Sequence, residues 1–134
     1  LSQKVDFRII VSSIQVLPIG HGWESWNNFP HQRKKLIKMI DNASLDQTLF
    51  ISGDRHRGGV YKVKSDSGKV ISEVTSSSLN ASFLNDEEYG PLRVGNTFIK
   101  ENYGVIIVDS ENNDMFVGIK NINGEIVRNI TISN

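Results

Sequence analysis

One stretch decides the fold of this chain: Gln47-Thr48-Leu49-Phe50-Ile51-Ser52-Gly53-Asp54-Arg55-His56. Its apolar run, residues 49–51, is typical of a buried strand that ends at the edge of a sheet. Gly53 permits a sharp turn, and Asp54 and His56 follow it beyond the strand. Carboxylates and imidazoles bind divalent metals, and open α/β sheets usually hold their sites at the carboxyl edge of their strands. The stretch therefore predicts a strand that leads into a candidate metal site.

The residues before this stretch predict two parallel strands joined by a helix. Residues 7–11 (Phe-Arg-Ile-Ile-Val) are nearly continuous in apolar character, which predicts a strand buried on both faces. Pro30 suits the first turn of a helix that carries a narrow apolar stripe and ends near Asp41 and Asn42. Together these elements form a βαβ-like unit with parallel strands and a right-handed crossover.

The residues after His56 predict a series of short strands. We expect strands at residues 59–63 and 70–74, and then a β-meander with strands at 97–100, 104–108, 115–119 and 125–132. Asn123-Gly124 is the strongest hairpin signal in the chain. The acidic run 86–88 is predicted to be a solvated loop, because it lacks the ligand spacing of a calcium loop. The economical interpretation is one α/β domain, or the back half of one.

Residues 20–30 predict a loop that combines glycines, aromatic rings, a histidine and a glutamate. Loops that hold such side chains near a sheet edge are frequently binding loops. Trp23, Trp26 and Phe29 leave two interpretations open, since they either border a pocket or cap the core. Phe29 is also placed to pack against the helix that follows it.

Composition narrows the function classes. The chain has 134 residues, and its fifteen basic and fifteen acidic side chains cancel, so no global field favours nucleic acid or an anionic membrane. The basic residues 33–35 and 38 are predicted to form the solvated face of a helix. The absence of cysteine excludes disulfide scaffolds, thiol catalysis and Cys-based zinc sites. No apolar run approaches the roughly 18 residues of a membrane span. Because a strand-like segment follows Leu1 almost at once, we expect the interior or tail of a longer protein.

The pair Asp54 and His56 leaves two interpretations open. On an extended backbone their side chains would point to opposite faces, whereas a turn after Gly53 lets them converge on a pair of ions. In the other interpretation Asp54 pairs with Arg55 or Arg57 in a purely structural turn. No Gly-x-Ser-x-Gly motif, Walker loop or dinucleotide fingerprint offers a different chemistry.

Four blocks in sequence resemble a known family. They are residues 9–15 (Ile-Ile-Val-Ser-Ser-Ile-Gln), residues 24–30 (Glu-Ser-Trp-Asn-Asn-Phe-Pro) with Arg33, residues 52–56 (Ser-Gly-Asp-Arg-His) and residues 73–77 (Glu-Val-Thr-Ser-Ser). In this order they resemble the alkaline phosphatase D-like family of the calcineurin-like metallophosphoesterase superfamily. The resemblance implies an α/β fold, a four-layer β-sandwich with flanking helices. Residues 1–134 would be the C-terminal portion of a metallophosphatase domain, with a strand-loop-helix-strand part (1–58) that carries the metal motif and a β-rich tail (59–134).

The resemblance also implies a site. The superfamily ends its metal motifs with Gly-His-x-His, and this family is similar but carries Gly-Asp-x-His, which matches residues 53–56. On that match Asp54 and His56 are metal ligands and catalytic residues, and Arg55 lies within reach of the substrate phosphate. Glu24 and Trp26 would border the substrate pocket, and His21, which has no counterpart in the family pattern, is carried as a further pocket residue.

The implied reaction is hydrolysis of phosphate mono- or diesters, with two or more divalent or trivalent ions as cofactors. Ligand type does not distinguish iron, calcium, manganese and zinc. The superfamily's other ligands come from upstream motifs that this sequence lacks, so the chain is expected to be inactive without the N-terminal part of the same protein. The family's usual placement is extracytoplasmic.

Two alternatives remain at this point. One is a non-catalytic β-rich module that binds a ligand or partner through its Trp loop and keeps Asp54 and His56 as a structural pair. The other is a homo-oligomer that completes its fold in trans, because a truncated sheet exposes hydrophobic edges.

Overall fold

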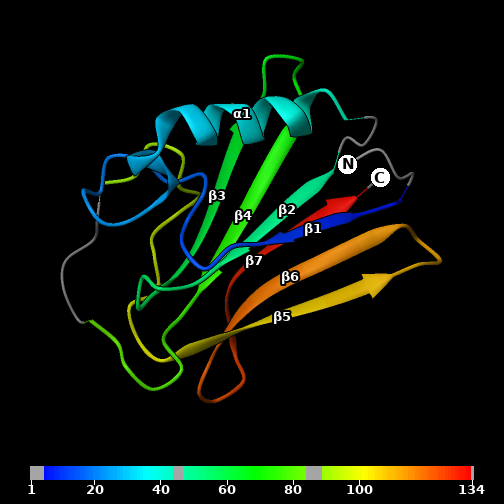
Figure 1. Cartoon of the computed structure of the whole chain (residues 1–134). Helices are drawn as coiled ribbons and strands as arrows, with labels where there is room; N and C mark the ends of the chain where they lie inside the picture. Colours follow the sequence, from blue (N-terminus) through cyan, green and yellow to red (C-terminus); the bar gives the residue numbers. More distant parts are fainter. Residues whose placement is uncertain (1–4, 44–46, 84–88, 134) are drawn as a thin grey trace.

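The computed structural model describes residues 5–43, 47–83 and 89–133. The acidic run 86–88, which is predicted to be a solvated loop, lies outside these ranges. The elements (Figure 1) are β1 (Arg8–Val11), η1 (Trp26–Asn28), α1 (Pro30–Asp41), β2 (Thr48–Ser52), β3 (Gly58–Lys64), β4 (Val70–Ser76), β5 (Asn102–Asp109), β6 (Asp114–Asn121) and β7 (Ile126–Ser133).

The first sheet has the strand order β1-β2-β4-β3. β1, β2 and β4 run parallel, and β3 is antiparallel to β4. The predicted parallel pairing of the two strands that flank the helix is confirmed, and α1 begins at Pro30 and ends at Asp41 as expected. Because three parallel strands end at one edge, the segments that follow them meet there.

The second sheet is the predicted antiparallel meander, with the order β5-β6-β7. Asn113 and Gly124 take positive φ values of 57° and 81° in its two hairpins. The strand expected at residues 97–100 is wrong, because Phe98 forms only an isolated bridge with Gly58. Gly95, at a φ of 71°, bends the chain between the bridge at Arg93 and the one at Phe98, so the segment touches the edge of β3 without forming a continuous ladder.

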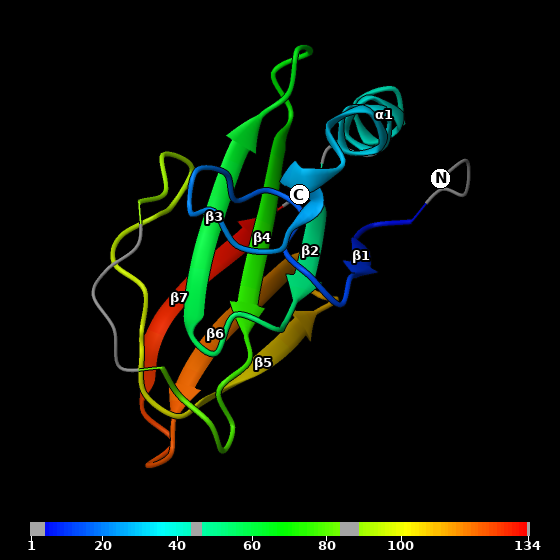
Figure 2. The same ribbon diagram turned by 60° about the vertical axis from the view of Figure 1, so that its left-hand side comes forward.

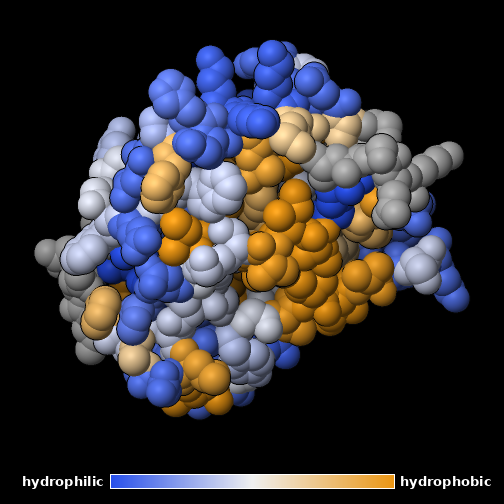
Figure 3. Space-filling view, in the orientation of Figure 1, coloured by the Kyte–Doolittle hydropathy of each residue, from blue (hydrophilic) through white to orange (hydrophobic). Residues whose placement is uncertain are grey.

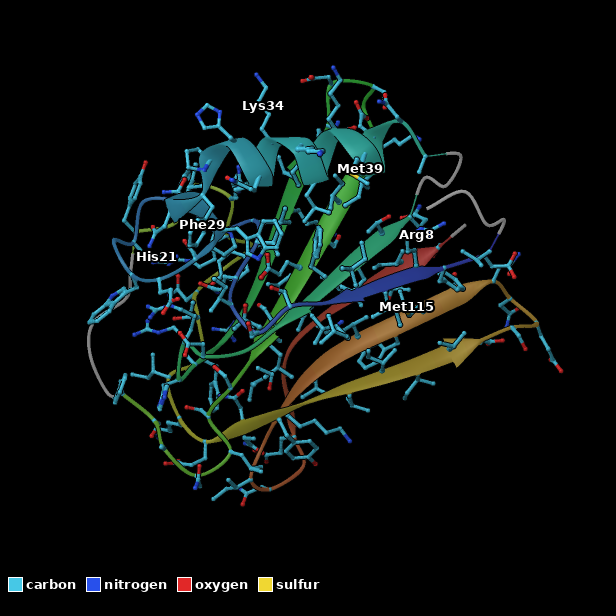
Figure 4. All side chains as sticks on the ribbon, in the orientation of Figure 1. Arg8, His21, Phe29, Lys34, Met39 and Met115 are labelled. Carbon is cyan, nitrogen blue, oxygen red and sulfur yellow. The ribbon has the colours of Figure 1, made fainter. Side chains whose placement is uncertain are left out.

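Two apolar cores separate three layers. Alternate residues of β2 point to opposite faces, so Phe50 packs against α1 whereas Leu49 packs against the second sheet. Figure 2 shows α1 on the outer side of the first sheet and β5, β6 and β7 on the other. Met115 on β6 lies in the core between the sheets (Figure 4). The predicted fold class, an α/β sandwich that ends in an antiparallel meander, is confirmed, and the described residues hold one helical layer and both sheet layers.

One side of the sandwich is open. The prediction that residues 7–11 are buried on both faces is wrong, because Ile9 and Val11 on β1 are 41% and 77% exposed. Among the described residues β1 pairs with β2 alone, so nothing covers its outer edge. β5 is the corresponding edge of the second sheet, and its Ile107 is 57% exposed. Both edges lie in the apolar area to the right of centre in Figure 3. Within the described residues, no helix is both long and apolar enough to cross a membrane.

Candidate functional site

Three polar segments meet at the carboxyl edge of the first sheet. They follow β1 (Ser12 and Ser13), β2 (residues 53–56) and β4 (Ser77 and Ser78). Gly53 lies between the other two segments, since a Cβ atom built on it would be 3.7 Å from both the Ser13 carbonyl oxygen and the Ser77 Cβ. The predicted place of the Gly53–His56 motif beyond a buried strand is therefore the one observed.

The turn after β2 is strained at its two candidate ligands. Asp54 and His56 have φ values of 68° and 51°, a left-handed conformation that costs an ordinary residue roughly 1–2 kcal/mol. The turn follows Gly53 as expected, but the positive φ values lie at Asp54 and His56 and not at Gly53. The Arg55 amide donates to the Gly53 carbonyl at 2.9 Å and closes the turn. Backbone strain of this kind clusters at functional sites.

His56 is held in a defined orientation. Its Nδ1 lies 2.8 Å from the Ala81 carbonyl oxygen, and because a carbonyl only accepts, Nδ1 carries the proton in this contact. In the neutral ring Nε2 then keeps its lone pair. The Phe83 ring stacks on the imidazole with centroids 4.3 Å apart and planes 5° apart. Metal-binding histidines typically donate their second ring N–H to a carbonyl or carboxylate in this way.

Arg55 lies in the same turn, largely buried beneath the tryptophan loop. Its guanidinium carbon is 5.3 Å from the centroid of the Trp23 ring, a cation–π contact. Trp23 is itself half-exposed, so it covers Arg55 and does not cap the core. The Trp23 amide donates to His21 Nδ1 at 3.0 Å, which fixes the loop beside the arginine. Figure 4 labels His21 in this loop, between β1 and α1.

The remaining predicted pocket residues divide between core and surface. Trp26 packs against the core beneath α1, and its Nε1 donates to Ser12 Oγ at 3.1 Å. Its ring also lines a groove of about 530 Å³ together with Val11 and Phe29. Phe29 is half-exposed and lies at the start of α1 (Figure 4), outside the cluster beneath the helix, and Glu24 is exposed.

Glu73 supports the site from the core, a role that the sequence pattern did not predict. This fully buried side chain on β4 accepts from the Val16 amide at 3.1 Å, the Leu17 amide at 2.5 Å and the Ser52 hydroxyl at 2.5 Å. Burial raises the pKa of Glu73, although these donors and the charge of Arg33 oppose the shift. The available signal was a charged residue in the middle of an apolar strand segment.

Arg33 holds the same segment as Glu73, and its position differs from the predicted one. It was predicted to lie on the solvated face of the helix, but Nε donates to the Val16 carbonyl at 2.6 Å and Nη2 to the Leu17 carbonyl at 2.7 Å. Burial lowers the pKa of Arg33. Lys34, the next residue, points away from the sheet (Figure 4), and Lys35 and Lys38 are exposed as well, so the prediction is wrong for Arg33 alone.

The fit to a metal is partial within this chain. Among the described residues there is no group of three or more His, Asp or Glu side chains that could hold an ion. Asp54 and His56 offer one carboxylate and one oriented imidazole, which is two ligands of the kind that a catalytic metal takes.

Comparison with known proteins agrees with this geometry. The model of the family described as PhoD-like phosphatase matches residues 1–129. A solved structure described as "Structure of PhoD" is similar, with a TM-score of 0.64 at 14% identity. The match covers 96% of this chain and 28% of that one, so the chain spans less than a third of that protein. A search of curated proteins gave no match.

Proposed function

Since this chain belongs to the PhoD-like phosphatase family, we propose that it supplies metal ligands and part of the substrate pocket of a metal-dependent phosphatase. The substrates would be phosphate mono- or diesters. The observation that carries the proposal is the orientation of His56, whose Nδ1 is occupied by the Ala81 carbonyl and whose Nε2 is left to bind an ion. The strained backbone at Asp54 and His56 supports a role beyond folding.

Each residue of the turn would have its own task. Asp54 and His56 would bind the ions through a carboxylate oxygen and Nε2. When bound, the metals would polarise the phosphoryl group and lower the pKa of a water molecule. Arg55, between the two ligands, would donate to phosphoryl oxygens, a geometry that guanidinium groups match well. Trp23, which lies against the guanidinium, would shield one of its faces from water and so strengthen the charge felt by an anion.

The tryptophan loop would form the substrate side of the pocket. Trp26 lines the groove that begins at the end of β1, and its ring would contact the alcohol portion of an ester. Glu24, exposed on the same loop, would border the entrance. His21 would act indirectly, because its Nδ1 is engaged by the Trp23 amide.

The remaining ligands would come from the upstream part of the longer protein. Asp54 and His56 alone give an incomplete site, and a two-metal centre needs ligands on both ions. The same upstream part would cover the open side of the sandwich, where apolar residues of β1 and β5 are exposed. We therefore expect no significant turnover from the 134-residue chain by itself.

The test is a set of single substitutions in the full-length protein, with metal content and hydrolysis of aryl phosphate mono- and diesters as readouts. His56→Ala and Asp54→Ala are expected to lower the bound metal and to reduce turnover by several orders of magnitude. His31→Ala is the matched control, because His31 is an exposed histidine on α1. Near-native turnover in His56→Ala would refute the metal role, and strong turnover by the isolated chain would refute the need for upstream ligands.

A further inference from the structure

A short segment after β4 contacts the candidate ligand His56 through a carbonyl oxygen and an aromatic ring. We infer that residues 78–83 fix both the tautomer and the ring plane of His56, so that Ser78 and Phe83 are positioning residues that set the affinity of the site for its metal. This inference rests on the proposed role of His56 as a ligand. It goes further by placing part of the control of metal affinity in a loop that contributes no ligand of its own.

The first contact is with a carbonyl oxygen that accepts two hydrogen bonds. The Ala81 oxygen accepts from His56 Nδ1 at 2.8 Å and from the Ser78 hydroxyl at 3.1 Å. A carbonyl oxygen has two lone pairs, and these two donors use both. Since the oxygen cannot donate, the contact requires a protonated Nδ1 and excludes the neutral tautomer in which Nδ1 is bare.

The second contact fixes the plane of the ring. Phe83 lies almost parallel to the imidazole, with planes 5° apart and centroids 4.3 Å apart. Rotation of the imidazole about its Cβ–Cγ bond would break the hydrogen bond to Ala81, and rotation out of the present ring plane would also break the stack. Phe83 is 52% exposed and belongs to neither apolar core of the described residues, so its burial adds little to the core.

The segment is itself tied to both sheets. Ser78 is fully buried, and its carbonyl accepts from the Asn102 amide at 2.8 Å. The Asn102 side-chain oxygen accepts from the Ser76 hydroxyl at 2.8 Å, and its Nδ2 donates to the Lys100 carbonyl at 2.7 Å. Asn102 therefore joins the end of β4 to the start of β5 and gives the segment a rigid base. The second sheet thus contributes to the orientation of a side chain that belongs to the first.

Removing the stack should change the tautomer of the His56 ring while the fold stays intact. In the metal-free full-length protein labelled with ¹⁵N-histidine, the His56 signals, identified by their loss in His56→Ala, should show a protonated Nδ1 and an unprotonated Nε2. Phe83→Ala and Ser78→Ala should shift these signals towards the tautomer mixture of free histidine. The metal dissociation constant should rise by about 10- to 100-fold, the range typical for loss of an outer contact to a ligand. Phe83→Leu, which keeps an apolar side chain but no ring, should behave like Phe83→Ala.

Leu79→Ala is the matched control, because Leu79 lies in the same segment with its side chain 73% exposed. It should keep the wild-type tautomer and metal affinity. If His56→Ala retains its metal, the proposed function fails, and with it the role of this segment. If His56→Ala loses its metal while Phe83→Ala and Ser78→Ala keep the wild-type tautomer and affinity, the proposed function stands and this inference is wrong.

Discussion

The contacts of Glu73 predict a large loss of stability in the variant Glu73→Leu. The carboxylate accepts from the Val16 and Leu17 amides, both on residues that are fully buried, and from Ser52 at the end of β2. A leucine of similar size fills the same space but offers no acceptor. The Val16 and Leu17 amides would then be buried without the carboxylate partner on which they depend.

The magnitude follows from these donors. Each buried N–H that loses its acceptor costs about 1–3 kcal/mol. Ser52 adds little, because its hydroxyl is also 2.8 Å from Thr75 Oγ1. The loss is partly offset because leucine, unlike a carboxylate, has no charge to desolvate, and burial of that charge is what raises the pKa of Glu73. We expect a net loss of about 2–4 kcal/mol, a large share of the roughly 5–15 kcal/mol that stabilises a typical domain.

Urea unfolding followed by tryptophan fluorescence measures this loss in the full-length protein. Trp26 reports on the affected loop, because its amide donates to the Gln15 carbonyl at 2.8 Å. Glu73→Gln is the control: its amide oxygen can accept from both backbone N–H groups and its amide nitrogen can donate to Ser52, so the expected loss is below about 1 kcal/mol. A Glu73→Leu variant within about 1 kcal/mol of wild type would refute the reasoning, as would an equal loss in both variants.

Two further predictions follow from the same region. Burial raises the pKa of Glu73 above 4.5, so the folded state binds the carboxyl proton more tightly than the unfolded chain does. The contribution of Glu73 to stability should therefore be complete below pH 4.5 and be lost as the pH rises through the folded pKa. Urea titrations at several pH values should show a free energy of unfolding that depends less on pH in Glu73→Gln than in the wild type. Asp54→Gly should relieve left-handed strain and keep or raise the free energy of unfolding by up to about 1 kcal/mol, while the full-length variant loses metal; a clear loss of stability would contradict the strain.

The elements that could be predicted from sequence are those set by local chemistry. The apolar run of β2, Pro30 at the start of α1 and Asn123-Gly124 in the last hairpin each act through neighbouring residues. The failures depend on partners that a local pattern does not specify. Residues 7–11 are apolar enough for a central strand, but β1 has a neighbour on one side only among the described residues. Residues 97–100 have strand-forming side chains but meet β3 at a single bridge.

The candidate site also has one part that the sequence predicts and another that it does not. Asp54 and His56 could be selected by residue type and by their place after a strand, and the structure puts them at the expected edge. The contacts that support these two residues could not be predicted from the sequence, because Ala81 lies 25 residues from His56, and Glu73 lies 57 residues from Val16. Arg33 shows the same limit, since its place in a run of basic residues predicts a solvated side chain and only the fold brings the Val16 and Leu17 carbonyls to it.

These distant contacts explain how a strained turn can persist at the edge of the sheet. Before the turn, Ser52 is held by Glu73, and after it Arg57 is buried with Nη1 donating to Thr97 Oγ1 at 3.2 Å. His56 is held between them by Ala81. A chain fixed at both ends cannot relax its left-handed residues by shifting along the strand, so the cost at Asp54 and His56 is met by contacts outside the turn. It follows that substitutions at Glu73 and at Phe83 should have separable effects: the first should lower the stability of the whole unit, and the second should change the orientation of His56 while the fold stays intact.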